Sequence, residues 1–207
     1  MPDFHAQTAD IIAHIKQCYH AYRRTEDIDR KGLFSPDCLQ ICRPMPSYAA
    51  TSRAEIVAYL HEAERGKIPA MTPAAGSFGN SALKDEMLES ARSTKSKSVY
   101  TIRALHPSEY NFGTDETCAP IGSTPEQLQE KAVKEEWAGM RVDLWGTGRD
   151  SDLLVKVQYW WRSEEIPAHE KMTDNTQKMG WRQCLHDIMY LGPKDGTEGT
   201  GEVEILE

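Results

Sequence analysis

The sequence lacks the cysteine patterns of metal-binding modules and disulfide-bonded domains. Its 207 residues include five cysteines, at positions 18, 38, 42, 118 and 184, and none of them forms a Cys-x-x-Cys pair. An odd number of cysteines without such spacing indicates neither a disulfide framework nor a zinc module. We therefore expect reduced thiols and a cytoplasmic protein.

Long hydrophobic runs and an excess of basic residues are also missing. No window approaches 18 consecutive apolar residues, and the first residues contain no basic region followed by an apolar one. Neither a membrane span nor a secretion signal is expected. The 24 Lys and Arg against 32 Asp and Glu give a net charge of -8. This charge argues against a nucleic-acid partner, because such a protein needs a basic face.

The excess negative charge is confined to two segments. Residues 113–137 contain six acids and two bases, and residues 194–207 contain five acids and one base. The rest of the chain is neutral, which is compatible with a neutral or weakly acidic lipophilic ligand.

The sequence signatures of cofactor sites are absent as well. There is no glycine-rich phosphate loop, no serine-centred elbow and no basic helix. His14 and Cys18, one helical turn apart, could begin a metal site, but no other ligand pair has diagnostic spacing. We expect no cofactor and no metal.

Hydrophobic periodicity predicts helices first and strands afterwards. After Thr8, apolar side chains recur on one helical face at Ile11, Ile15, Tyr19 and Tyr22. Further helices are expected at 26–34, 52–66, 81–92 and from 123, and strands at 38–43, 99–106, 140–145, 153–162 and 181–191. This order indicates an α+β fold. The length favours one domain, 1–193, with insertions at about 67–98 and 113–137 and an acidic flexible tail at 194–207.

The segment LFSPDCLQICRPMPSYAATSRAEIVAYL, residues 33–60, carries a Leu-Phe pair, a Pro-Asp pair, a Pro near the end of the predicted strand and an Arg-x-x-Ile helix start. In these features it resembles the nuclear transport factor 2-like superfamily. That superfamily includes ketosteroid isomerase, scytalone dehydratase, limonene epoxide hydrolase and the SnoaL-like polyketide cyclases. The long predicted strands after residue 140 look like those of the same fold.

The resemblance implies a cone-shaped fold, in which three N-terminal helices cover a strongly curved mixed β-sheet around an apolar pocket. Such pockets bind small hydrophobic molecules. The two insertions could form a lid over its mouth. The resemblance also implies a homodimer formed through the sheet face, which would carry Lys156, Gln158, Trp160 and Arg162.

Several residues could contact a substrate in such a pocket. Tyr19 and Tyr22 match the first-helix tyrosines that hold a substrate oxygen in the resembled enzymes, although both also fit an amphipathic core helix. Arg43 stands before Pro44, where ketosteroid isomerase has its Asp-Pro general base. Because a guanidinium cannot abstract a proton, Arg43 would hold an oxygen or lie on the surface. The expected substrate-binding set is completed by Tyr48, Tyr159 and Trp161.

Three residues are candidates for acid/base catalysis. His186 and Asp187 are neighbours on the last predicted strand and point to opposite faces, so one of them faces the pocket; periodicity does not choose between them. Histidine titrates nearer to neutral pH, whereas Asp187 would need burial to act as an acid. Asp143 shares a face with Arg141, either as a salt link on the outer face or as a polar corner of the pocket.

These residues support two main hypotheses. The first is a cofactor-free SnoaL-like isomerase, cyclase or dehydratase acting on a hydrophobic oxygenated metabolite such as a polyketide or terpenoid. The second is a non-catalytic small-molecule-binding or dimeric assembly module of the same fold. Epoxide hydrolysis is a third possibility, which requires an Asp-Arg-Asp cluster with Asp143 and Arg141 turned inward.

Overall fold

The computed structural model describes residues 8–24, 33–64, 98–146, 153–166, 179–198 and 203–206. The predicted helix at 81–92, most of the predicted helix at 26–34 and most of the insertion at 67–98 lie outside the described residues. Phe34, expected at the end of a helix, instead begins a strand. The elements in chain order are α1 (Ala9–Arg24), β1 (Phe34–Cys42), η1 (Pro46–Tyr48), α2 (Arg53–Glu64), β2 (Ser98–Ala104), η3 (Pro107–Glu109), α4 (Asp115–Cys118), η4 (Ala119–Ile121), α5 (Pro125–Lys134), β3 (Ala138–Gly146), β4 (Leu153–Glu165), β5 (Met179–Pro193) and β6 (Val203–Leu206).

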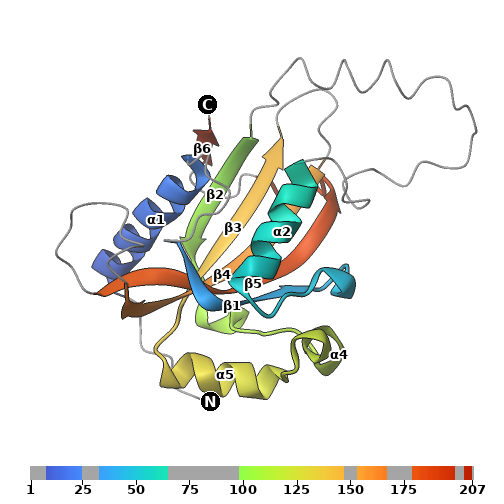
Figure 1. Cartoon of the computed structure of the whole chain (residues 1–207). Helices are drawn as coiled ribbons and strands as arrows, with labels where there is room; N and C mark the ends of the chain where they lie inside the picture. The colour runs from blue at the N-terminus through green and yellow to red at the C-terminus, as the bar shows by residue number, and fades with distance from the viewer. Residues whose placement is uncertain are drawn as a thin grey trace, which may run out of the picture.

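The strands form one six-stranded, curved sheet in the order β1-β5-β4-β3-β2-β6 (Figure 1). The β1 and β5 pair is parallel, and the other four pairs are antiparallel. The ladder between β4 and β5 shifts register twice, between Lys156 and Val157 and between Trp160 and Trp161. Such bulges bend and twist a strand pair. The predicted α+β class with a curved mixed sheet is thus confirmed.

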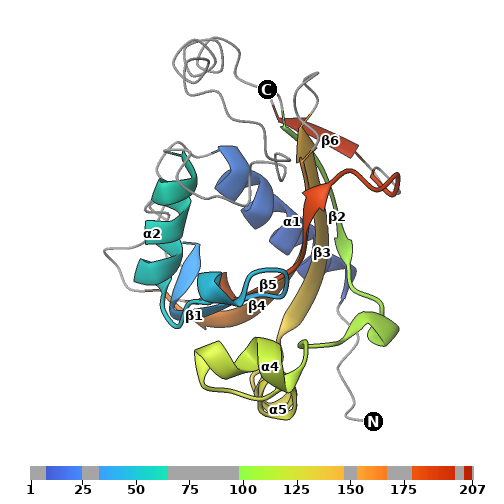
Figure 2. The same cartoon turned by 90° about the vertical axis from the view of Figure 1, so that its right-hand side faces the viewer.

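The sheet has an inner face and an outer face, and each is covered by different helices. Helices α1 and α2 lie on the inner face, whereas α4 and α5 lie on the other side of the sheet (Figure 2). The inner core joins α1 to residues such as Met140 and Trp161, and the outer core joins Leu128 of α5 to Trp160 and Leu185. The expectation that residues 113–137 form a lid over the inner face is therefore wrong, because their apolar side packs on the outer face.

Helix α1 follows directly from its sequence pattern. The Thr8 hydroxyl accepts a hydrogen bond from the Ile11 amide at 3.4 Å, as an N-terminal cap does. Ile15, Tyr19 and Tyr22 are buried along one face, as their spacing predicts. The helix therefore presents two tyrosines to the inner face of the sheet.

The C-terminal segment contributes an edge strand. Residues 203–206 pair antiparallel with β2, with Val203 opposite Thr101 and Leu206 opposite Ser98. This pairing differs from the flexible tail that the charge and glycine content predict at 194–207. Val203 and Ile205 alternate with glutamates, but Leu206 directly follows Ile205, and so short a pattern does not distinguish a strand from a tail by sequence alone.

Candidate functional site

The structure places His186 and Asp187 on opposite faces of β5. His186 is paired with Tyr159 of β4, and the two rings meet edge to face with centroids 4.9 Å apart. Asp187 is paired with Gln158, on the outer face. Between the two candidates, His186 is the one that faces the inner side, where α1 lies.

Around His186 the inner face carries a group of aromatic rings, which we call the tyrosine–histidine cluster: Tyr19, Tyr22, Tyr100, Tyr159 and His186. Tyr19 is its centre, with ring centroids 5.6 Å from Tyr22, 5.3 Å from Tyr100 and 5.4 Å from Tyr159. Tyr19 is 1% exposed and His186 is 4% exposed. The cluster therefore links the first helix to the last long strand through the core of the cone.

A bulge in β5 gives His186 a polar partner. Trp160 pairs with Leu185 and Trp161 with Gln183, so Cys184 is the extra residue in the β5 strand. This places Gln183 and His186 on the same face although they are three residues apart. The Gln183 Oε1 atom lies within hydrogen-bond distance of the His186 Nε2 atom. This contact orients the His186 ring through its Nε2 atom.

Burial keeps the phenols of the cluster protonated. It raises the pKa of Tyr19 far above its usual value, and the positive charge of Arg23 opposes the rise only in part. Burial also raises the pKa of Tyr159. At neutral pH both side chains are therefore neutral hydrogen-bond donors. The Tyr19 hydroxyl has no hydrogen bond of regular geometry among the described residues, although Tyr159 lies near enough to influence its ionisation.

Two residues at this site, Arg23 and Tyr100, are not among those predicted from the sequence. Arg23 follows Tyr19 by four residues and so lies on the same face of α1. Tyr100 of β2 is buried against Tyr19, and its hydroxyl bonds the Nδ1 atom of His20. The i, i+4 spacing of Tyr19 and Arg23 could have indicated the first. No local signal indicates that Tyr100 meets α1, because the contact joins distant parts of the chain.

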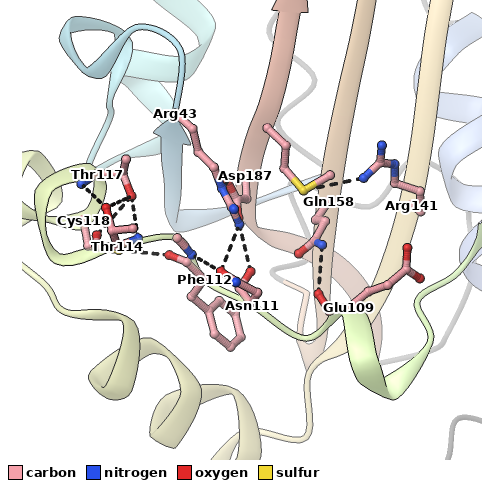
Figure 3. A network of polar contacts seen from close by, with 12 residues as sticks. Arg43, Glu109, Asn111, Phe112, Thr114, Thr117, Cys118, Arg141, Gln158 and Asp187 are labelled. Carbon is pink, nitrogen blue, oxygen red and sulfur yellow. Dashed lines mark hydrogen bonds and ion pairs between the residues drawn. The ribbon is translucent and has the colours of Figure 1, made fainter. Parts of the chain in front are cut away.

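On the outer face, Arg43 and Asp187 form a buried ion pair (Figure 3). The Arg43 Nε atom donates to Asp187 Oδ1 at 2.9 Å and its Nη2 atom donates to Oδ2 at 2.6 Å. Nη2 also donates to the backbone oxygen of Asn111 at 3.0 Å. Burial raises the pKa of Asp187, against the opposing effect of Arg43. Arg43 therefore binds both Asp187 and Asn111, and the structure does not bring Arg43 or Asp187 together with Tyr19.

Asp143 also lies on the outer face. The Arg141 Nε atom donates to Asp143 Oδ1 at 2.7 Å, which is the salt link that the sequence pattern allows as one of its two alternatives. The inward polar corner is not formed. Epoxide hydrolysis requires an Asp-Arg-Asp cluster inside the cone. Asp143 and Arg141 do not contribute to such a cluster, because both lie on the outer face.

The remaining predicted binding residues divide between the core and the periphery. Trp161 and Tyr159 belong to the inner core. Tyr48 lies in η1, where its ring contacts Tyr59 of α2 with centroids 5.4 Å apart. It therefore sits beside α2 and not in the tyrosine–histidine cluster. Among the described residues no group of three His, Cys, Asp or Glu side chains is arranged as a metal site.

Helices on the inner face of a curved mixed sheet, with polar aromatic side chains between them, define a class of cone-shaped α+β domains. The chain belongs to the SnoaL-like domain family of the nuclear transport factor 2-like superfamily, because the model of that family matches residues 4–207. Searches of curated proteins and of solved structures give no significant match. None of the helices in the described part of the chain is both long and apolar enough to cross a membrane.

Proposed function

We propose that this protein is a cofactor-free enzyme that isomerises, cyclises or dehydrates a hydrophobic oxygenated metabolite by acid/base catalysis. The proposed substrate is a polyketide or terpenoid of secondary metabolism, and the proposed compartment is the cytoplasm. The observation that carries the proposal is the line of contacts from Tyr19 through Tyr159 to His186, which puts a base and two phenol donors on one face of the sheet. SnoaL-like membership supports it at the level of the family.

The proposed mechanism divides two roles between two elements. His186 of β5 takes a proton from a carbon next to a carbonyl group, and the contact with Gln183 orients the imidazole ring. Tyr159 of β4, whose ring contacts the His186 ring, donates a hydrogen bond to the developing enolate oxygen. Its raised pKa keeps it protonated, and its hydrogen bond to a charged oxygen is stronger than one to a neutral oxygen.

Proton abstraction can be tested without knowing the natural substrate. 2-Tetralone is a hydrophobic ketone whose α-protons exchange with D₂O, and nuclear magnetic resonance follows that exchange. We expect the wild-type protein to accelerate exchange, and His186→Gln to reduce the acceleration by about 100-fold, the size of a general-base contribution. His14→Gln, at an exposed histidine of α1, is the matched control and should exchange at the wild-type rate. Equal rates for the wild type and His186→Gln would overturn the proposal.

The dense packing of the cluster supports a second candidate, a non-catalytic binding or assembly module. Tyr19, Tyr22, Phe34 and His186 are each at most 4% exposed and contact one another or shared ring neighbours. In this alternative the inner face is only a structural core, and the protein functions by forming a homodimer. Trp160 and Gln158 are both buried on the outer face, so the proposed dimer would use the partly exposed side chains of the same strand, Lys156 and Arg162.

Sedimentation distinguishes the two candidates when it is combined with the exchange assay. A dimer that Lys156→Glu converts to a monomer, together with no acceleration of 2-tetralone exchange, would favour the assembly module. Exchange that depends on His186 would exclude a purely structural role.

A further inference from the structure

Arg23 places a positive charge beside the tyrosine–histidine cluster, and no carboxylate of the described residues forms an ion pair with it. It is half-buried on α1, and its Nε atom is buried and has no hydrogen-bond partner among the described residues. No carboxylate of the described chain forms an ion pair with it, whereas Arg43, Arg141 and Arg162 all have such pairs. Arg23 is therefore different from the arginines of the outer face.

The groups nearest to Arg23 are phenols. Four tyrosines, at positions 19, 22, 100 and 159, lie close enough to affect its ionisation. Burial lowers the pKa of Arg23, and the four phenol groups raise it by more, through the negative charge that each carries only when it is ionised. Because Tyr19 and Tyr159 are themselves neutral at physiological pH, the surroundings solvate the cation without neutralising it.

A second polar group at the same place makes no hydrogen bond of regular geometry among the described residues, although Tyr159 lies near it. The Tyr19 hydroxyl is one helical turn before Arg23, is buried, and makes no regular hydrogen bond to the described residues. Leaving a buried donor unsatisfied costs about 1–3 kcal/mol, and burying an unpaired charge costs more. Two unsatisfied donors on adjacent turns of one helix indicate a single acceptor that binds both.

We propose that Arg23 and Tyr19 together bind an anionic oxygen of the substrate, a carboxylate or an acidic phenolate attached to an apolar ring system. An anion balances the guanidinium charge, and its two or more lone-pair sites accept from both the Nε group and the hydroxyl. The apolar part of the ligand then lies against the aromatic rings of the cluster. The inference rests on the proposed function and deepens it, because it narrows the proposed substrate class from oxygenated metabolites in general to lipophilic acids.

A matched pair of probes tests the charge requirement. 2-Naphthoate and 2-naphthalenemethanol share the same ring system and differ in having a carboxylate or a neutral alcohol. In calorimetric titrations at pH 7 we expect the wild-type protein to bind 2-naphthoate at least tenfold more tightly than the alcohol. Arg23→Gln should remove this preference, leaving the affinity for the alcohol within about twofold of the wild type. Equal affinity of the wild-type protein for both probes, or binding of neither, would overturn the inference.

Two further variants separate the site from general electrostatics. Arg24→Gln removes the same charge from the exposed side of α1, and it should keep the wild-type preference for 2-naphthoate. Arg23→Lys should retain part of the preference, since it keeps the charge and loses the planar donor geometry. If Arg24→Gln weakened binding as much as Arg23→Gln, a diffuse attraction would replace the specific site.

The failure of this inference can be told apart from the failure of the proposed enzyme activity. His186→Gln should bind 2-naphthoate like the wild type, because His186 acts on the carbon skeleton and not on the anion. Charge-selective binding without His186-dependent exchange of 2-tetralone would contradict the activity alone. If exchange of 2-tetralone depends on His186 but the protein shows no preference for 2-naphthoate, the anion site is contradicted and the enzyme activity is not. A cooperative thermal transition of each variant confirms that it is folded.

Discussion

His186 and Asp187 are consecutive residues of β5, yet one contacts Tyr159 in the inner core and the other forms an ion pair with Arg43 on the outer face. The peptide bond between them therefore joins the two faces of the sheet. Because they share one strand, contacts of Asp187 on the outer face also restrain His186 on the inner face. The Arg43 and Asp187 pair thus positions the strand that carries the proposed base.

The two members of this ion pair should differ in their contribution to stability. Asp187 is 0% exposed, whereas Arg43 is 24% exposed and can reach water when its partner is lost. Arg43→Gln leaves a buried carboxylate and should lower the free energy of unfolding by about 3–5 kcal/mol at pH 7. Asp187→Asn should lower it by about 1–2 kcal/mol. Urea unfolding measures both values, and a larger loss for Asp187→Asn would contradict this account.

The pH dependence of Arg43→Gln follows from the raised pKa of Asp187. A carboxyl group whose pKa is higher in the folded chain than in the unfolded chain binds its proton more tightly when folded. It destabilises the fold at pH values above its folded pKa, and this effect disappears as the pH falls to the unfolded value of 3.8. The stability difference between the wild type and Arg43→Gln should therefore shrink on acidification. A constant difference from pH 7 to pH 4 would exclude an ionised Asp187.

Glu109 has the opposite behaviour. The two hydrogen bonds from Arg103 lower the pKa of Glu109 from 4.5 to about 2. A lowered pKa stabilises the fold above pH 4.5, and the contribution is lost as the pH falls through 2. Because Arg103 is 44% exposed, solvent screening limits the contribution to about 1 kcal/mol. Glu109→Gln should remove this part of the acid dependence of unfolding, and Glu130→Gln, at an exposed site on α5, should leave it unchanged.

Gly139 of β3 tests how tightly the outer core is packed. A Cβ atom there would lie 2.6 Å from Leu105 Cδ1 and 3.0 Å from the Trp160 ring. Leu105 can rotate, but the buried indole cannot move without disturbing α5. Gly139→Ala should therefore cost about 1–3 kcal/mol. Gly122→Ala is the control for conformational strain alone, because φ is +67° there and no atom lies within 4 Å; it should cost about 1 kcal/mol. If both variants lose the same free energy of unfolding, the side chains around Gly139 move aside and the outer core is less tightly packed than this account requires.

Sequence pattern predicted the elements better than it predicted which side chains meet. The periods of α1, β3 and β4 were long enough to define their buried faces, and the Thr124 cap of α5 matches its Ser-Thr-Pro-Glu signal. Strict alternation along β5 would put Gln183 on the face of Asp187, but the structure puts it on the face of His186. The β-bulge at Cys184 reverses the alternation. A bulge depends on the pairing of two strands, so neither strand encodes it alone.

The same limit explains the position of residues 113–137. Their apolar residues predict a short helix, but a helix with one apolar side fits either face of a sheet. The face is decided by Trp160 and Leu185, which lie far along the chain and leave an apolar surface on the outer side. Long-range packing therefore overruled the expectation of a lid.

Substitution of Tyr19 tests directly whether its hydroxyl serves ligand binding and not the stability of the fold. Tyr19→Phe removes a buried hydroxyl that has no regular hydrogen bond among the described residues, so the free energy of unfolding should stay within about 1 kcal/mol of the wild type or rise. Tyr59→Phe is the matched control, because its hydroxyl donates to the Ala49 carbonyl at 3.3 Å and its removal should lower stability by about 1 kcal/mol. In the same preparations, Tyr19→Phe should weaken 2-naphthoate binding several-fold and Tyr59→Phe should not. A Tyr19→Phe protein that loses stability but keeps its affinity would make Tyr19 a packing residue and not a ligand for the anion.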